Sequence, residues 1–243
     1  MHPATTFVLS HGLDIGSPIA TGLAARGGRV AWLSDGSEAA ATDLGATVAR
    51  LDVGFASRAE LEQAFAAAQA RVGPPSQVVV SAIPRAGLRA QAIGSLAEDD
   101  WRAACGAAMK SVLYALQAAY TALAGRGGSV VVVGPSLSLA GAAQLVALST
   151  AIEGQRGLVK STARQWGQRG ITVNWIAAAP RGLSPAFDGL PLPVKPDAVM
   201  VALGRPLDLA SEIAPVIEFL GSAAGRVITG ATLVLDGGEW MVP

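Results

Sequence analysis

The chain has 243 residues, and its 18 Lys and Arg residues balance its 18 Asp and Glu residues to a formal net charge of zero. This balance, with no dense basic block, argues against nucleic acid as a partner. Because Gly, Pro or a charged residue interrupts each apolar stretch well before the roughly 18 residues of a membrane span, we expect no contact with the membrane interior.

The first predicted strand and helix are separated by a turn with two glycines. Residues 7–9 form a short apolar run, residues 19–25 predict a helix of small residues, and Gly12 and Gly16 lie between them. A glycine turn between a strand and a helix allows the backbone to approach a nucleotide diphosphate at the helix N-terminus. Gly12 and Gly16 are therefore our candidate cofactor-binding glycines.

Other side chains of this turn leave its role open. Asp14 would place a carboxylate near a diphosphate, where like charges repel, but it is equally suited to the first turn of a helix. Ser17 followed by Pro18 resembles an N-cap and first helical residue, which predicts a late helix start. His11 is either a ligand-facing base or a solvated turn residue.

Strands and helices alternate through the middle of the chain. We expect strands at 29–35, 48–53, 77–82 and 129–133, and helices at 58–72, 99–124 and 144–166. Asp35 has the spacing of an acid that holds a ribose hydroxyl, or of an ordinary turn residue. Cys105 is interpreted as a small buried helix residue. The alternation predicts a Rossmann-like α/β fold, a doubly wound parallel sheet with helices on both faces.

The last quarter of the chain adds a strand at 171–177, a helix at 204–220 and a closing strand at 229–235. Between the first two lies a Pro-rich segment at about 179–203, which we interpret as a lid, a binding loop or a contact with a partner chain. The length suits one sizeable core, so we expect residues 1–243 to form a single domain.

Chemistry is expected after the strand at 129–133, because ligands of open α/β sheets bind beyond the carboxyl ends of the strands. The residues there and on the facing helical turn are small, hydroxylic or apolar: Gly134, Pro135, Ser136, Ser138, Leu148 and Ile152. Nothing near them in sequence moves a proton at neutral pH except an unassisted hydroxyl. We therefore assign no catalytic residue and no metal ligand.

Several segments together resemble the short-chain dehydrogenase/reductase superfamily. They are the overall order of elements and residues 51–53, 100–101, 169–174, 204–206 and 228–238. The resemblance covers essentially the whole chain. The closing segment is its most specific part, and the N-terminal glycine turn is its least specific part.

The resemblance implies what the site should contain. Enzymes of the family bind a nicotinamide cofactor through a Thr-Gly-x-x-x-Gly-x-Gly turn and use an Asn, Ser, Tyr and Lys set for proton transfer. On this sequence the turn falls on Leu9, Ser10, Asp14 and Gly16, and the catalytic set falls on Ala108, Pro135, Leu148 and Ile152. Without a phenol of lowered pKa, general acid catalysis worth about a hundredfold to ten-thousandfold is missing.

The resemblance also implies an assembly and a nucleotide site. Asp52 and Val53 would seat an adenine ring beside Gly12 and Gly16, but we expect this NAD(P) site to be vestigial and the protein to have no cofactor. Our leading hypothesis is a non-catalytic subunit that assembles with an active dehydrogenase paralogue through the two long helices and the C-terminal strand. This is similar to the inactive subunit of the heteromeric dehydrogenase of benzylsuccinate β-oxidation. A homo-oligomer is the alternative assembly.

Two other functions stay open. One is an enzyme with a repurposed pocket, a lyase, cyclase or isomerase, with the candidate groups His11, Ser136, Ser138 and Arg181. The other is a protein that binds a nucleotide or metabolite without turnover. The single cysteine and the absence of a basic region before the first strand lead us to expect a cytoplasmic protein. The 51% of hydrophobic residues favours contact with another subunit.

Overall fold

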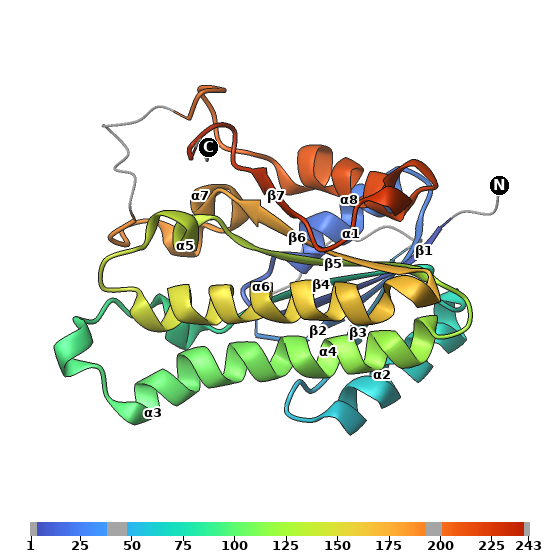
Figure 1. Ribbon diagram of the computed structural model, residues 1–243, viewed down its shortest axis with the longest axis horizontal. Helices are drawn as coiled ribbons and strands as arrows, with labels where there is room; N and C mark the ends of the chain where they lie inside the picture. Colours follow the sequence, from blue (N-terminus) through green and yellow to red (C-terminus); the bar gives the residue numbers. More distant parts are fainter. Residues whose placement is uncertain (1–3, 38–47, 193–200, 241–243) are drawn as a thin grey trace.

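The computed structural model describes residues 4–37, 48–192 and 201–240, and in this part of the chain a seven-stranded sheet lies between two layers of helices (Figure 1). All neighbouring strands are parallel, in the order β3-β2-β1-β4-β5-β6-β7. The predicted doubly wound α/β fold is therefore confirmed. The strands are β1 (Thr5–Gly12), β2 (Arg29–Ser34), β3 (Val48–Asp52), β4 (Gln77–Ile83), β5 (Gly128–Pro135), β6 (Ile171–Ala178) and β7 (Thr232–Leu235).

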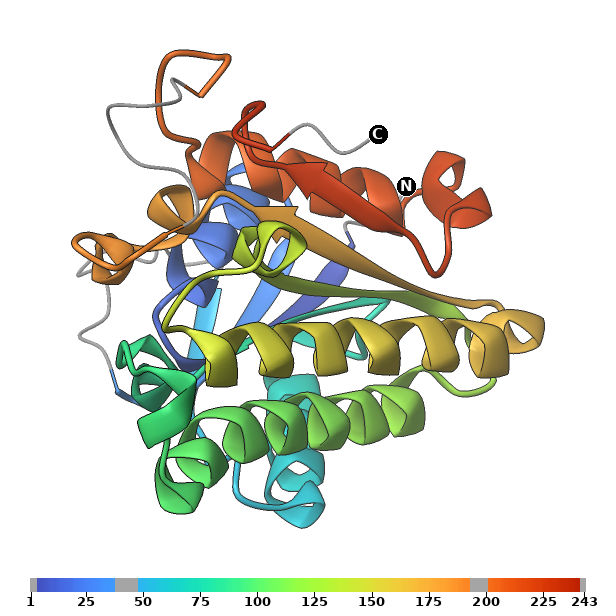
Figure 2. The same cartoon turned by 60° about the vertical axis from the view of Figure 1, so that its left-hand side comes forward.

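The long helices divide between the two faces of the sheet (Figures 1 and 2). One face is covered by α2 (Arg58–Val72), α4 (Ala107–Leu123) and α6 (Val146–Trp166), and the other by α1 (Gly16–Ala25) and α8 (Ala214–Gly221). Three short helices complete the fold: α3 (Glu98–Trp101), α5 (Leu137–Ala140) and α7 (Pro180–Leu183). None of the helices in the described ranges is long and apolar enough to cross a membrane.

The central strands are buried on both faces, which explains their uninterrupted apolar sequences. Each residue of β4 and of β6 is buried, as are the four valines of β5 from Val130 to Val133. Parallel strands covered by helices on both faces typically lack alternation of apolar and polar residues. The indole nitrogen of buried Trp32 donates a hydrogen bond to Ser10 Oγ at 2.9 Å, which satisfies the polar atom that this side chain carries into the core.

One strand end and the interior of one helix differ from the prediction. Strand β5 does not stop at Gly134 and Pro135, because it pairs with β6 as far as Pro135 and Ala178, and Ser136 N then donates to Ala178 O. A β-carbon on Gly134 would lie 2.5 Å from the Trp175 ring, so glycine is required there for packing. The helix expected at 99–124 contains a π-helical turn, Arg102–Gly106, between α3 and α4.

The Pro-rich segment is described only in part. Its first half folds as α7 and a 3-10 turn, Pro185–Phe187, in which Phe187 is fully buried. Residues 193–200 lie outside the described part of the chain. The helix expected at 204–220 begins only at the π-helical turn Leu209–Ile213, where the Asp208 carboxylate accepts from Ser211 N at 2.7 Å. This Asp provides the cap that a helix start requires.

Candidate functional site: the carboxyl edge of the sheet

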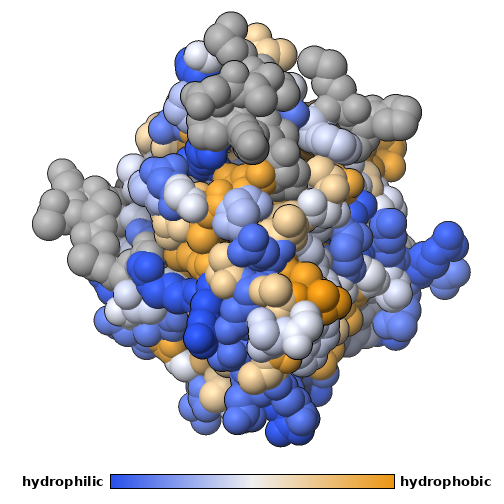
Figure 3. Space-filling model, turned by 90° about the vertical axis from the view of Figure 1, so that its left-hand side faces the viewer, coloured by the Kyte–Doolittle hydropathy of each residue, from blue (hydrophilic) through white to orange (hydrophobic). Residues whose placement is uncertain are grey.

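The strand order reverses between β1 and β4, and ligands of open α/β sheets bind at such a switch point, beyond the carboxyl ends of the strands. Figure 3 looks onto this edge: apolar side chains gather in the middle of the face and hydrophilic ones surround them. Two cavities along this edge differ in size and chemistry, one beside β1 to β3 and one beside the start of α6.

The two predicted glycines of the β1–α1 turn are both required by close packing. Gly12 has a φ of +91°, and a β-carbon there would lie 2.2 Å from the backbone oxygen of Ile83 on β4. A β-carbon on Gly16 would lie 2.6 Å from Trp32 Nε1 and 2.7 Å from Ser10 Oγ. Gly12 thus joins β1 to β4, and Gly16 brings α1 onto the sheet.

Helix α1 begins earlier than expected. Its first residue is Gly16, so Ser17 and Pro18 lie inside the first turn and the late start predicted from them is wrong. Asp14 Oδ1 accepts from Ser17 N at 2.8 Å, and Pro18 has no N–H that would need a partner. The carboxylate of Asp14, which lies just before the N-cap residue Ile15, therefore satisfies one N–H of the first helical turn.

The larger cavity, about 740 Å³, lies beyond the ends of β1, β2 and β3 and against α4. We call it the His11 cavity; its lining includes His11, Asp35, Val53, Phe55, Arg102, Lys110, Ser111 and Tyr114. Of the predicted adenine pair, Val53 lines this cavity. Asp52 does not: its side chain is 66% exposed and accepts from Arg50 Nη2 at 2.9 Å.

His11 links three elements across the floor of this cavity. Its Nδ1 lies 2.7 Å from Ser111 Oγ on α4, and its Nε2 lies 3.6 Å from Asp35 Oδ2 at the end of β2. The ring stacks on Phe55 with centroids 5.0 Å apart and an interplanar angle of 11°. Burial lowers the pKa of His11 below its ordinary value, and the nearby Asp35 carboxylate opposes this shift only in part. The imidazole is therefore neutral at pH 7.

The Asp35 carboxylate has two backbone partners besides the imidazole. Its Oδ2 accepts from Gly12 N at 2.8 Å and its Oδ1 accepts from Ser37 N at 3.0 Å. These bonds hold the carboxylate in the wall of the cavity, and each of its oxygens can accept a further hydrogen bond. The predicted ribose acid is thus in a position that could accept a hydrogen bond from a sugar hydroxyl.

The start of α6, unlike the His11 cavity, is closed by packed apolar side chains. Leu148 and Ile152 are 2% and 1% exposed and lie one turn apart on the buried face of α6. A β-carbon on Gly87, in the segment after β4, would lie 3.3 Å from Leu148 Cδ1, so this segment closes tightly over the helix. Packed apolar side chains therefore fill the space at the two positions to which the resemblance assigns the family's Tyr and Lys.

A buried amide joins the elements below these two residues. Gln155, one further turn along α6, is 2% exposed, and its Nε2 donates to Ala82 O of β4 at 3.0 Å and to Ala108 O of α4 at 3.2 Å. Each of the two amide hydrogens thus satisfies one buried carbonyl. The carbonyl of Ala108, the residue at the family's Asn position, is thereby occupied by this side chain.

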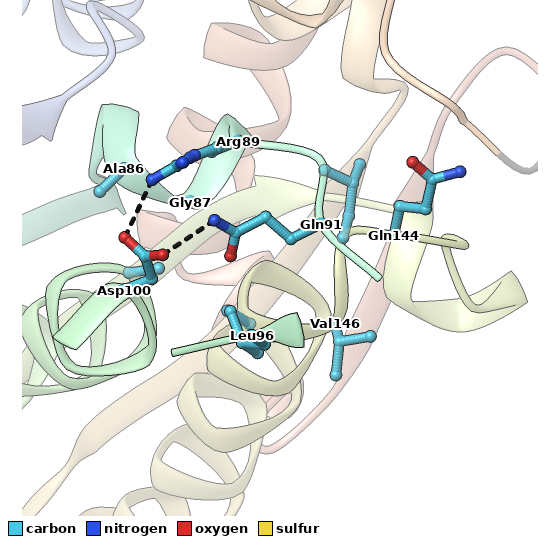
Figure 4. A pocket seen from close by; sticks show the side chains of 11 residues that line it. Ala86, Gly87, Arg89, Gln91, Leu96, Asp100, Gln144 and Val146 are labelled. Carbon is cyan, nitrogen blue, oxygen red and sulfur yellow. Dashed lines mark hydrogen bonds and ion pairs between the residues drawn. The ribbon is translucent and has the colours of Figure 1, made fainter. Parts of the chain in front are cut away.

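The cavity beside the start of α6 is only about 10 Å³, the space of a single water molecule (Figure 4). The Asp100 carboxylate accepts from Arg89 Nη1 at 3.1 Å and from Gln91 Nε2 at 2.8 Å, and Gln91 N donates to Gln144 O at 2.8 Å. These bonds hold the segment after β4 against the entrance to α6, where Gln144 adopts a φ of +63°. No substrate-sized space remains in this described cavity.

The four groups suggested for a repurposed pocket are not brought together at His11. Ser136 is buried, Ser138 Oγ is buried and unpartnered within the described ranges, and Arg181 Nε lies 3.9 Å from Asp188 Oδ1. None of these three residues lines the His11 cavity. The sequence analysis did not name Phe55, Lys110 and Ser111, which line the His11 cavity, or Gln155, which joins α6 to β4 and α4. The only signal for Phe55 was its position two residues after Val53.

Comparison with known proteins identifies the family. A family model described as enoyl-(acyl carrier protein) reductase matches residues 12–239. The chain is 32% identical over 248 residues to galactitol 2-dehydrogenase (L-tagatose-forming) of Cereibacter sphaeroides, covering 97% of this chain and 94% of the relative. This chain is a short-chain dehydrogenase/reductase. It is also 30% identical over 239 residues to the 3-oxoacyl-[acyl-carrier-protein] reductase of Escherichia coli K12, covering 94% and 93% of the two chains.

A solved relative corrects our expectation about the cofactor. The blue fluorescent protein from a metagenomic library, solved in complex with NADPH, is 26% identical to this short-chain dehydrogenase/reductase, with a TM-score of 0.77 over 97% of each chain. The prediction that the protein has no nucleotide cofactor is therefore wrong. It relied on the missing glycines of the turn and could not account for the His11 cavity, which is formed largely by residues outside that turn.

Proposed function

We propose that this short-chain dehydrogenase/reductase is a nucleotide-binding subunit that does not itself transfer hydride and that assembles with an active NAD(P)-dependent dehydrogenase paralogue. The observation that carries the proposal is the apolar, closed start of α6, where Leu148 and Ile152 are 2% and 1% exposed. Hydride transfer to or from a carbonyl requires a group that moves the proton of the oxygen. Neither side chain holds a proton, and neither faces open space.

The buried amide of Gln155 supports the same conclusion. In active relatives the Asn position supports a proton-relay water, and here the Ala108 carbonyl at that position is satisfied by Gln155 Nε2 at 3.2 Å. A relay water would have to compete with this bond and with the second bond to Ala82 O. The site is therefore built for packing and polar satisfaction at the place where the family's enzymes move protons.

The His11 cavity fits the adenosine end of a nicotinamide nucleotide. Val53 and Phe55 line one wall and offer apolar and aromatic surface for a base, and Asp35 has carboxylate lone pairs for ribose hydroxyls. Lys110 lines the same cavity and supplies a cation for a phosphate. Bound NAD(P) supplies hydride chemistry in active members of the family; the residues named here would hold it by its adenosine end.

Exposed apolar surface supports assembly with a second chain. Val227 and Phe219, near β7 and on α8, are 88% and 43% exposed, and Leu113 on α4 is 38% exposed. Strand β7 is one of the two outer strands of the sheet, and each of its four residues is only partly buried. Edge strands of this kind are usually covered in natural proteins. Because Cys105 is a free buried thiol, we expect the complex in the cytoplasm.

The test compares the chain alone with its complex. The purified chain is assayed with NAD and NADP against secondary alcohols and 3-hydroxyacyl thioesters, and native mass spectrometry is run on the chain isolated gently from its host. We expect no turnover by the chain alone and a complex with a second chain of similar mass that is active. Turnover by the isolated chain above a heat-denatured control would overturn the proposal, and so would a stable homo-oligomer without any second chain.

A further inference from the structure

His11 is the one histidine among the residues that line the His11 cavity, and it connects the three elements that form the cavity floor. It comes from β1, its Nδ1 lies 2.7 Å from Ser111 Oγ on α4, and its Nε2 lies 3.6 Å from Asp35 Oδ2 beyond β2. The side chain is 22% exposed, so a ligand in the cavity can reach it. A partly buried imidazole with polar groups near both nitrogens can act as a proton acceptor.

The hydrogen bonds assign the proton on the neutral ring. Ser111 Oγ donates its hydrogen to Ala107 O at 2.9 Å, so it accepts the bond from His11 and Nδ1 is the protonated nitrogen. Nε2 is then the unprotonated nitrogen with a free lone pair, and it lies 3.6 Å from Asp35 Oδ2. Protonation of Nε2 would turn a contact between two acceptors into an ion pair, without moving the ring away from Ser111 or Phe55.

The other charged or titratable side chains that line the cavity come from three places in the fold. Asp35 follows β2, and Arg102, Lys110 and Tyr114 come from the π-helical turn and α4. Arg102 pairs with Glu98 through an exposed salt bridge, whereas Lys110 has no charged partner within the described ranges. Among the side-chain types that line the cavity, imidazole is the one whose ordinary pKa lies near neutral pH. His11 is therefore the cavity group whose charge a bound anion would change, by opposing the burial that lowers its pKa.

We propose that His11 takes up a proton when a nucleotide phosphate binds in this cavity, so that binding is coupled to pH through this one residue. The proposal rests on the nucleotide-binding part of the proposed function and adds the residue that regulates it. A phosphate that enters lies among Lys110, Arg102 and His11, because these are the cationic and potentially cationic walls. An anion close to the ring favours the imidazolium form over the neutral one.

Linkage then fixes the direction of the effect. In the free protein, burial keeps the pKa of His11 low and the ring is neutral at pH 7. A bound anion raises it, so the complex holds more protons than the free protein and affinity increases as the pH falls. The increase is at most about tenfold per pH unit, the limit for uptake of one proton. The effect is confined to the range in which His11 titrates.

The experiment measures proton uptake directly by isothermal titration calorimetry. The probe is ADP-ribose, which carries the adenosine end and a diphosphate without the phosphate monoester that titrates near pH 6. Titrations at pH 7.0 in three buffers of different ionisation enthalpy give the number of protons taken up. We expect a clear fraction of one proton for the wild type, and affinity that rises from pH 8 to pH 6.

Two variants separate the role of His11 from a general charge effect. His11→Asn keeps a side chain that can bond to Ser111 but cannot titrate, and it should bind ADP-ribose with no proton uptake and a flat pH profile. Lys160→Gln removes an exposed cation on α6, away from the His11 cavity, and should retain both uptake and pH dependence. Because the chain has only two His residues, histidine Cε1 resonances in the wild type and His11→Asn assign the titration of His11 by NMR.

The outcomes are distinct. Binding without proton uptake, or uptake that persists in His11→Asn, would overturn the role of His11 and leave the proposed nucleotide site intact. Failure of ADP-ribose and NAD to bind at any pH would overturn the nucleotide-binding part of the proposed function itself, and the coupling with it. An unchanged NMR titration of His11 on saturation with ADP-ribose would likewise contradict the coupling.

Discussion

The two ends of the carboxyl edge both contact α4 but offer different environments. Beside β1 to β3, α4 contributes Lys110 and Ser111 to a cavity of about 740 Å³ whose walls combine apolar, polar and charged side chains. Beside the start of α6, apolar contacts and a buried amide leave a cavity of about 10 Å³. One scaffold can therefore hold an open cavity at one end and closely packed side chains at the other, because the two ends depend on different side chains.

The difference also shows what holds the edge together. The open end is fixed by polar contacts among residues far apart in sequence, such as His11 with Ser111 and Asp35 with Gly12. The closed end is fixed by the packing of Leu148 against the segment that includes Gly87 and by the Gln155 amide. Substitutions at each end should therefore separate loss of binding from loss of stability.

The largest expected effect on stability is at Gly12, where the end of β1 lies in close contact with the end of β4. Gly12→Ala places a β-carbon 2.2 Å from Ile83 O at a φ of +91°, and we expect a loss of at least about 3 kcal/mol in unfolding free energy. Gly36→Ala is the matched control: its φ is +72° but nothing lies within 4 Å, so the cost should be about 1 kcal/mol. Urea denaturation measures both; equal losses would mean that the close approach to β4 does not matter.

The second test opens the closed end. Leu148→Ala removes a fully packed side chain and should lower the unfolding free energy by about 2–5 kcal/mol, because the surrounding residues cannot fully fill the space. Leu113→Ala on α4, where the side chain is 38% exposed, should cost clearly less. ADP-ribose affinity, measured at one pH, should not change for Leu148→Ala. A loss of affinity would show that the two ends are not independent.

The third test removes the buried amide. Gln155→Met keeps the length of the side chain but leaves Ala82 O and Ala108 O without their donor, at a cost of about 2 kcal/mol. Gln165→Met, on the exposed side of the same helix, should change stability by less than about 0.5 kcal/mol. Thermal and urea unfolding of both variants decide the point. An unchanged unfolding free energy in Gln155→Met would mean that water replaces the amide. The argument that Gln155 excludes a proton-relay water at Ala108 would then lose its support.

The smallest expected effect is on the pH dependence of stability. Burial lowers the pKa of His11 in the folded chain, so the unfolded chain binds a proton more readily. Unfolding therefore takes up a proton, and stability falls as the pH drops from 7 through the ordinary titration range of histidine. In His11→Asn this part of the acid dependence should disappear in urea melts at pH 7 and pH 5. An unchanged difference between these pH values would contradict the assigned environment of His11.

Much of the fold could be predicted from the sequence, because β-branched runs such as residues 129–133 between Gly and Pro signals are decided locally. The boundaries could not. The extension of β5 through Pro135 depends on pairing with Ala178, and the start of α1 depends on the Asp14 carboxylate. Such partners are fixed only once the chain has folded, so they leave no local pattern.

The candidate site was predictable only where a motif lies within one stretch of chain. Asp35 and Val53, which line the His11 cavity, could be named from their places at the ends of predicted strands, whereas His11 and Ser111 are 100 residues apart and meet only through the packing of α4 on the sheet. The mistaken expectation of no cofactor has the same origin. It judged the site by one turn, while the walls of the His11 cavity come from β2, the segment after β3, and α4 as well.

The central claim is that the adenosine end of the nucleotide site is open and the nicotinamide end is closed. The most direct measurement is calorimetric binding of the two halves of the cofactor, AMP and nicotinamide mononucleotide, to the full chain at pH 8, with competition by NAD. The account predicts that AMP binds and competes with NAD, and that nicotinamide mononucleotide does not bind at millimolar concentration. Binding of nicotinamide mononucleotide as tight as that of AMP would contradict it.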